Sequence, residues 1–148
     1  MSEKNFLADM ENLFLALADK TRLRLLNLMR EDEICVCYFS EVLGESQPKV
    51  SRHLAYLRNA GIVSARREGK WMHYQIEMPE NPFAKKILQD TLEWLKAQDE
   101  MRGDFEKLAA VCCSMEVPVT IARAPTPKTF AEAHITSKPK EELETFLL

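Results

Sequence analysis

The sequence predicts a mostly α-helical fold of the α+β class with a single β-hairpin, and three observations lead to this prediction. Apolar residues recur at three- and four-residue intervals near the start of the chain and again beyond residue 81, the spacing of amphipathic helices. Between them, residues 62–76 are rich in β-forming side chains around Glu68-Gly69, a turn signal. The 148 residues are 46% hydrophobic and 29% charged, which is enough to bury one core. We therefore expect one globular domain over residues 1–113 and a proline-containing tail over residues 114–148.

The predicted helices have their own boundary signals. Asp19 is suited to cap a second helix after the N-terminal one, and Gly44 ends a short third helix. Ser46 caps the next helix and Pro48 fits its first turn, so two short helices flank a tight turn. Asn81-Pro82 opens one long helix whose apolar stripe repeats about every 3.5 residues. Because such a stripe needs a partner, we expect the long terminal helices to form the interface of a homodimer.

Composition excludes several classes of protein. No stretch approaches the roughly 18 apolar residues of a membrane helix, and residues 1–9 are acidic rather than basic and then apolar. We therefore expect a cytoplasmic protein with no membrane partner, whose four cysteines are thiols in two clusters. No nucleophile–base pair, phosphate-binding glycine loop or HExxH motif is present, so we expect that the protein is not an enzyme.

One block of the chain is basic although the net charge is −3. Residues 47–79 carry a net charge of +4, whereas residues 1–46 carry −4 and residues 80–148 carry −3. The predicted order of elements is that of a winged helix-turn-helix, in which one helix enters the DNA major groove and a hairpin wing reaches the flanking backbone. Short polar side chains of this block are suited to read base edges, and basic ones to bind phosphate. The expected base-reading residues are Gln47, Ser51 and His53, and the expected phosphate-binding residues are Lys49, Arg52, Arg58, Arg66, Arg67 and Lys70.

Four fragments with a characteristic order and spacing carry a family resemblance. They are Ala18–Arg22, Ile34–Cys37, Gly44–Leu54 and Arg67–Tyr74. Together they resemble the arsenic-responsive repressors of the ArsR/SmtB family of metalloregulators, over roughly residues 6–110. The resemblance implies a homodimeric repressor that binds a twofold operator in double-stranded DNA, needs no cofactor to do so, and dissociates when As(III) or Sb(III) binds as inducer. The family's zinc sensors use histidines of the last helix, and this chain has none between Asn81 and Cys113.

Cys35 and Cys37 are the expected core ligands of the inducer. Thiolates select soft ions such as As(III), Sb(III), Cd(II), Pb(II) or Zn(II), and two thiols at this spacing can close a small chelate. Side chains two residues apart point about 200° away from each other in a regular helix, so a shared ion requires backbone that leaves helical geometry or never adopts it. The pair stands at the entrance to the DNA-binding motif, so we expect ion capture to shift the helix of residues 46–57 and release the DNA.

The completion of this site stays open at the level of sequence. The best-known arsenic repressors have a third cysteine where this chain has Ser40. A third sulfur could come from Cys112 or Cys113 of either chain, these two could form a separate site, or two thiols and a solvent ligand could serve. The family's cadmium and lead sensors also use a CxC pair here but complete it with N-terminal cysteines, and no cysteine precedes Cys35.

Other interpretations of the same residues remain. The basic block could be a solvated face and His53 an inert exposed residue. The cysteines could be small core or surface residues, or a thiol switch that forms a disulfide on oxidation while the scaffold still binds DNA. Outside gene regulation, a thiol oxidoreductase or a protein-interaction module would need no DNA.

Overall fold

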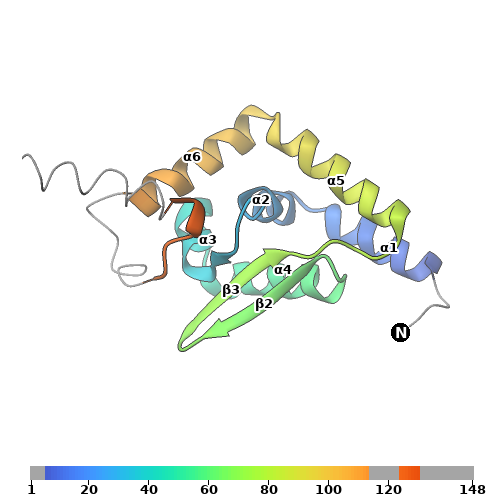
Figure 1. Ribbon diagram of the computed structural model, residues 1–148, viewed down its shortest axis with the longest axis horizontal. Coiled ribbons are helices and arrows are strands. Elements are labelled where there is room, and N and C mark those ends of the chain that lie inside the picture. The colour runs from blue at the N-terminus through green and yellow to red at the C-terminus, as the bar shows by residue number, and fades with distance from the viewer. Residues whose placement is uncertain (1–5, 114–123, 131–148) are drawn as a thin grey trace, which may run out of the picture.

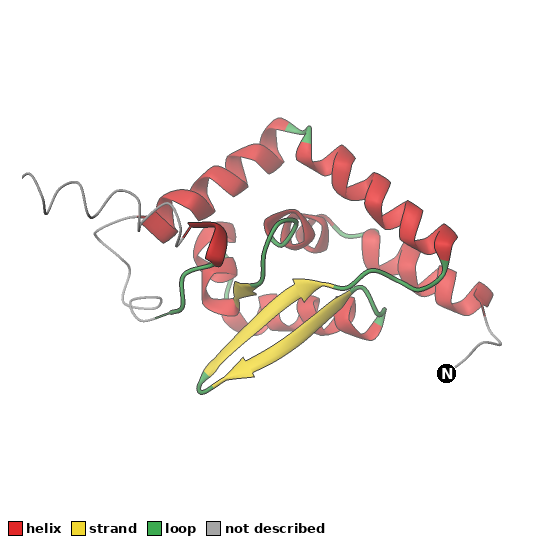
Figure 2. Cartoon of the chain, in the orientation of Figure 1, coloured by secondary structure: helices red, strands yellow, loops and turns green. Residues whose placement is uncertain are grey.

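The computed structural model describes residues 6–113 and 124–130, and its elements follow the predicted order. Helices α5 and α6 form an arch over α2, while the β2–β3 hairpin projects from the helical body below them (Figures 1 and 2). This mostly helical winged helix-turn-helix confirms the predicted fold class. No helix within residues 6–113 or 124–130 is long and apolar enough to cross a membrane. The elements are α1 (Phe6–Leu17), α2 (Lys20–Leu28), β1 (Ile34–Cys35), α3 (Val36–Leu43), α4 (Gln47–Asn59), β2 (Val63–Glu68), β3 (Trp71–Ile76), α5 (Pro82–Lys96) and α6 (Asp99–Cys113).

The turn between α3 and α4 forms through local signals. Gly44 has a φ of 67°, in the left-handed region that glycine adopts without strain, and its N–H donates to the carbonyl of Ser40 to end α3. The Ser46 hydroxyl then accepts the N–H of Lys49 at 3.4 Å, which caps α4, and Pro48 fits the first turn. Because α4 anchors one face in the core, its opposite face is free for solvent. The core-facing residues are Val50, Leu54 and Leu57.

A two-residue strand, which the sequence did not predict, completes the sheet. Strands β2 and β3 pair in antiparallel fashion around Gly69, and β1 adds to the other edge of β3. In this register Ile34 lies opposite Tyr74, and Cys35 lies opposite His73. The segment just before α3 is therefore hydrogen-bonded to the wing.

The prediction of one long helix from Asn81 onward is wrong, because the helix breaks at Ala97 and Gln98. Their N–H groups donate to the carbonyls of Trp94 and Leu95, three residues back, which tightens the end of α5. The Gln98 side chain also donates to the Trp94 carbonyl, and its own carbonyl accepts from Arg102 to start α6. The break lets α6 pack on α2 and α3, so its apolar stripe is buried within the chain.

Polar contacts fasten α2 to α6. Arg24 forms a two-pronged ion pair with the buried Asp104, at 2.7 and 3.0 Å, and this hydrogen bonding raises the pKa of Arg24. Asn27, fully buried, donates to the Met101 carbonyl at 2.8 Å. The Arg30 guanidinium lies 4.0 Å from the centre of the Phe105 ring. Arg24 and Arg30 thus connect α2 with α6.

Helices α1 and α5 expose large apolar side chains. Such patches on a chain typically mark an interface with another molecule. The apolar stripe near the N-terminus is only partly buried in the chain, since of its members Leu13 faces the core and Phe14 is half exposed. The exposed large apolar residues of these two helices are Phe6, Leu7, Phe14, Leu15, Phe83 and Trp94.

Residues 124–130, which belong to the predicted tail, pack against the domain beside α3 and α6 (Figure 1). The Tyr38 hydroxyl donates to the Ala124 carbonyl at 3.2 Å. The Asp32 carboxylate accepts from the Thr129 N–H at 3.0 Å and from its hydroxyl at 3.3 Å. The Phe130 ring lies 5.9 Å from that of Phe105, centre to centre. The remainder of the tail, residues 114–123 and 131–148, lies outside the described residues.

Candidate thiol site and nucleic-acid interface

The structure brings Cys35 and Cys37 together at the junction of β1 and α3. Cys35 is the last residue of β1 and the N-cap of α3, with extended backbone (φ −70°, ψ 140°), while Cys37 lies in the first turn of the helix. Their Sγ atoms are 3.4 Å apart, and both residues are at least 97% buried. Extended backbone at Cys35 removes the 200° divergence expected in a regular helix. Both sulfurs can therefore face one ligand without unwinding α3.

The two thiols are not equivalent in their acidity. The hydrogen bond from Cys37 lowers the pKa of Cys35 to about 7, against the effect of burial, and the N–H groups of Val36 and Cys37 also favour the thiolate. Donation of the same hydrogen bond, together with burial, raises the pKa of Cys37. Near neutral pH Cys35 is thus partly a thiolate while Cys37 stays a thiol, and thiolate is the form that binds soft ions.

A network of charged side chains lies next to the thiol pair. Directly opposite residues of neighbouring strands share a face of the sheet, so Cys35, His73 and Arg66 form a row. His73 is buried, with Nε2 3.0 Å from a Glu68 oxygen and Nδ1 3.9 Å from a Glu33 oxygen. Arg66 donates to Glu33 at 2.6 Å, and this bond lowers the pKa of the Glu33 carboxyl.

A polar hollow of about 510 Å³ opens over this network and is closed on one side by residues 125–128. His73, which lines the hollow, is the cross-strand neighbour of Cys35, whereas the buried Cys35 and Cys37 are not among the lining residues. The residues around it are Asp32, Glu33, Arg66, Glu68, His73, Gln75 and Pro125–Lys128.

A third ligand is not in place. Among residues 6–112 and 124–130, no three Cys, His, Asp or Glu side chains gather closely enough to hold an ion. Cys112 is buried on α6, which packs on α3, and its charge contributes, after burial, to raising the pKa of Tyr38 to about 12. The side chain of Cys113 lies outside the described part of the chain. Of the four cysteines expected as ligands, the structure therefore joins Cys35 and Cys37.

Helix α4 presents part of the predicted DNA-reading set to solvent. Gln47, Ser51, Arg52 and Arg58 are exposed on its outer face. Lys49 is only partly exposed and pairs with Glu45 at 3.1 Å. A pair of this kind is weak in water, so phosphate can displace it.

His53 has a different setting from the one expected of a base-reading residue. It is half-buried, with Nδ1 3.4 Å from an Arg22 nitrogen and 3.8 Å from an Asp19 oxygen. Arg22 also donates to the carbonyls of Leu15 and Ala16 at the end of α1. Its guanidinium lies 4.1 Å from the Tyr56 ring centre on α4. Arg22 thus fixes α4 relative to α1, a role that no local sequence signal indicated.

The wing carries the remaining basic residues of the predicted interface. Arg67 donates to the Gly69 carbonyl at the hairpin turn, and Lys70 lies 5.1 Å from the Trp71 ring centre. Arg66 is exposed but shares its charge with Glu33 and Glu68. Contact of these three residues with phosphate stays a prediction.

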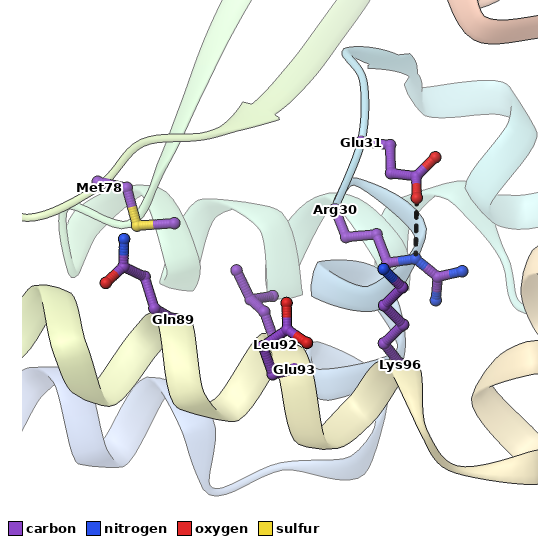
Figure 3. Close-up of a pocket in the computed structure, with 7 residues that line it drawn as sticks. All are labelled: Arg30, Glu31, Met78, Gln89, Leu92, Glu93 and Lys96. Carbon is purple, nitrogen blue, oxygen red and sulfur yellow. Dashed lines mark ion pairs between the residues drawn. The ribbon is translucent and has the colours of Figure 1, made fainter.

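A second hollow, of about 280 Å³, lies between α5 and the loop after α2 (Figure 3). Its charged groups include Arg30 and Glu31, whose facing atoms are 3.9 Å apart. The one sulfur in its lining is the thioether of Met78, so this hollow offers no thiolate. Its lining residues are Arg30, Glu31, Met78, Gln89, Leu92, Glu93 and Lys96.

Comparison with known proteins finds matches to the helix-turn-helix segment and to most of the domain. The family described as "Bacterial regulatory protein, arsR family" matches residues 19–65. The arsenical resistance operon repressor of Escherichia coli K12 is 41% identical over 103 residues, 69% of this chain and 86% of that protein. The arsenic resistance transcriptional regulator ArsR1 of Pseudomonas putida is 46% identical over 88 residues, 56% of this chain and 69% of that protein.

Among solved structures, HlyU from Vibrio cholerae superposes with a TM-score of 0.53 and 32% sequence identity. The match covers 65% of this chain and 99% of the other chain. The shared part is therefore a whole winged-helix domain.

We predict that Cys35 titrates near neutral pH. Thiolate absorbance in the ultraviolet, taken as the difference between the wild type and Cys35→Ser, should rise with a midpoint of about pH 7. Cys37→Ala should move this midpoint upward, because the hydrogen-bond donor is lost. The folded pKa lies below the reference of 9.0, so Cys35 contributes free energy of unfolding that increases from about pH 7 toward pH 9. A midpoint near 9 in both proteins would show that the hydrogen bond does not tune Cys35.

Proposed function

The chain belongs to the ArsR family of bacterial regulatory proteins, and from this premise we propose a homodimeric repressor that leaves its operator when As(III) or Sb(III) binds Cys35 and Cys37. Membership confirms the resemblance found in the sequence. Proteins of this family are DNA-binding transcriptional regulators rather than enzymes, and this chain is one of these regulators. The inducer, the dimer and the thiolate mechanism are the parts that we propose.

The separation of the two sulfurs carries the proposal. Two sulfurs 3.4 Å apart, each about 2.3 Å from a shared ion as in thiolate complexes, subtend an angle of about 95° at that ion. A tetrahedral ion such as Zn(II) favours about 109°, which needs sulfurs farther apart. A trivalent arsenic or antimony ion is pyramidal, with a lone pair that compresses its bond angles toward 90°. The two sulfurs are thus close enough to share one small soft ion, and their separation fits the narrow bond angle of a pyramidal trivalent ion.

The relatives support the same inducer class. The two curated relatives described above are named for arsenical and arsenic resistance. Cadmium is the alternative on the same scaffold, because a cadmium resistance regulator of Staphylococcus aureus is 36% identical over 70 residues. We favour arsenic or antimony, since the described residues offer two thiols but no third and fourth soft ligand beside them.

The position of Cys35 connects ligand binding with both DNA-contacting elements. Cys35 is hydrogen-bonded through β1 to β3 of the wing, and it is the N-cap of α3, which packs on α4. An ion that draws the two sulfurs into its coordination sphere therefore pulls on the wing and on the first turn of α3 together. The sequence left open whether the backbone at Cys35 leaves helical geometry or never adopts it. The extended backbone at Cys35 supports the second option and a shift at the strand–helix junction.

The free energy available is sufficient for release. Moving a two-state protein from 1:99 to 99:1 takes about 5.5 kcal/mol of differential binding. Structural thiolate sites in small zinc peptides bind with apparent free energies of about 10–16 kcal/mol. Coupling of about a third to just over half of such an energy to the DNA-binding conformation would release the operator.

Operator binding and dimerisation are supported by two surfaces. The exposed face of α4 and the wing carry the basic residues of a +4 block in a chain of net charge −3. The exposed apolar residues of α1 and α5 lie away from the tip of that wing (Figure 1). A second copy that covers the apolar helices leaves both basic faces free for two half-sites.

Replacement of Arg52 by alanine should weaken operator binding. The slope of log K against log salt should become shallower by about 2, because each protomer of the dimer loses one phosphate contact. Arg102→Ala is the matched control, since Arg102 is exposed on α6, on the far side of the domain from α4 (Figure 1). Fluorescence anisotropy with labelled operator measures both slopes. Equal slopes for the two variants would argue against α4 as the DNA-binding face.

Arsenite should release the operator from the wild type and not from Cys35→Ser or Cys37→Ser. Both variants lose one of the two sulfurs that face a shared ion, and serine oxygen is a poor ligand for soft ions. We expect the half-maximal arsenite concentration to rise by at least about a hundredfold, which corresponds to about 2.7 kcal/mol. Cys112→Ser and Cys113→Ser, tested singly, show whether either residue supplies a third sulfur.

Two outcomes would redirect the proposal. Release of DNA by peroxide but not by arsenite would show a redox switch. Release by cadmium at concentrations far below those of arsenite would show a cadmium-type sensor.

A further inference from the structure

Ser40 carries a buried hydroxyl that is unpaired among the described residues. Its Oγ atom is inaccessible to solvent and finds no hydrogen-bond partner among the described residues. Its backbone carbonyl, in contrast, is satisfied by the N–H of Gly44 at 3.0 Å. A buried hydroxyl without a partner is unfavourable, and an alanine at this position would avoid the penalty. An unpaired buried hydroxyl of this kind is a candidate contact for a ligand bound nearby.

Helix geometry places this hydroxyl beside the thiol pair. Ser40 follows Cys37 by three residues within α3, and residues at this spacing are neighbours on a helix surface, about 5–6 Å apart between Cβ atoms. Side chains of a helix lean toward its N-terminus, which directs Ser40 back over the turn that contains Cys37. The Ser40 side chain is therefore directed toward the turn that contains Cys37, one of the two proposed ligands.

The chemistry of arsenite binding creates a partner of the right kind. Arsenite in neutral water is the trihydroxide As(OH)₃. Cys35 and Cys37 displace two hydroxides, and two As–S bonds replace two As–O bonds. The two hydroxides leave as water with the proton of Cys37 and with a second proton, which comes from Cys35 or, where Cys35 is already a thiolate, from solvent. Arsenic stays trivalent, so no oxidant or reductant is needed. One hydroxide remains on the arsenic and can both donate and accept a hydrogen bond.

We propose that Ser40 hydrogen-bonds this remaining hydroxide, so that the inducer is held by two sulfurs and one oxygen. The inference rests on the proposed function, because it requires Cys35 and Cys37 to be the thiol ligands. Ser40 is then a positioning residue for the inducer. It closes the third side of a site for which the described residues offer no third Cys, His, Asp or Glu in reach.

The competing completion is a third sulfur. Cys112 is buried on α6, and α6 packs on α3. Recruitment of this residue would displace the last oxygen from arsenic and would leave Ser40 without a partner in both states. The two completions therefore differ in the atoms bound to arsenic.

The test combines arsenite affinity, arsenic X-ray absorption and thermal stability of the free protein. Wild-type protein should show two sulfurs and one oxygen on arsenic. Ser40→Ala should bind arsenite about tenfold more weakly while the free variant melts at the same or a higher temperature, since it loses a hydroxyl that only the bound state uses. Ser64→Ala, the same change on β2, is the matched control and should keep wild-type affinity. Ser40→Cys should bind more tightly and show three sulfurs.

Three results would count against the inference or its premise. Three sulfurs on arsenic in the wild type would overturn it, as would unchanged affinity in Ser40→Ala. A wild-type affinity retained in Cys35→Ser would instead overturn the proposed function, so the two failures are distinguishable.

Discussion

The pairing of a two-residue strand with the wing is the constraint on which the candidate site depends. Ile34 and Cys35 are extended because they are paired with Tyr74 and His73. If α3 began one turn earlier, the sulfurs of Cys35 and Cys37 would point away from each other. The pairing therefore creates the thiol pair, and it also makes the wing part of the same unit. One short stretch of backbone thus joins the proposed inducer ligands to the wing that is expected to contact DNA.

Much of the fold could be predicted because its signals are local. Gly44, Ser46 and Pro48 define the turn and the start of α4 by backbone conformation and capping, which depend on a few neighbouring residues. The hairpin follows from β-forming residues around Gly69. The nearness of Cys35 and Cys37 could be expected only as one of two options, since their spacing fits a chelate in extended backbone and not in a helix.

The remainder depends on contacts between distant parts of the chain. A strand of two residues has no periodicity, so β1 could not be seen before its pairing with β3 was known. The break between α5 and α6 depends on the Gln98 side chain, which satisfies a carbonyl that a continuous helix would have used. The partners of Arg66 and Asp104 lie 33 and 80 residues away in sequence. The charge pattern of the sequence predicted only a phosphate contact for Arg66 and gave no sign of its ion pairs with Glu33 and Glu68.

Hydrogen–deuterium exchange of the free protein, with and without arsenite, tests most directly whether ligand capture acts at the strand–helix junction. We expect amide protection to change in residues 34–43 and 71–76 on arsenite addition, because these segments share the β1–β3 pairing and the first turn of α3. The Cys37→Ser protein should show no such change under the same conditions. Bound arsenite that leaves both segments unaltered, or that alters only α5 and α6, would contradict the account.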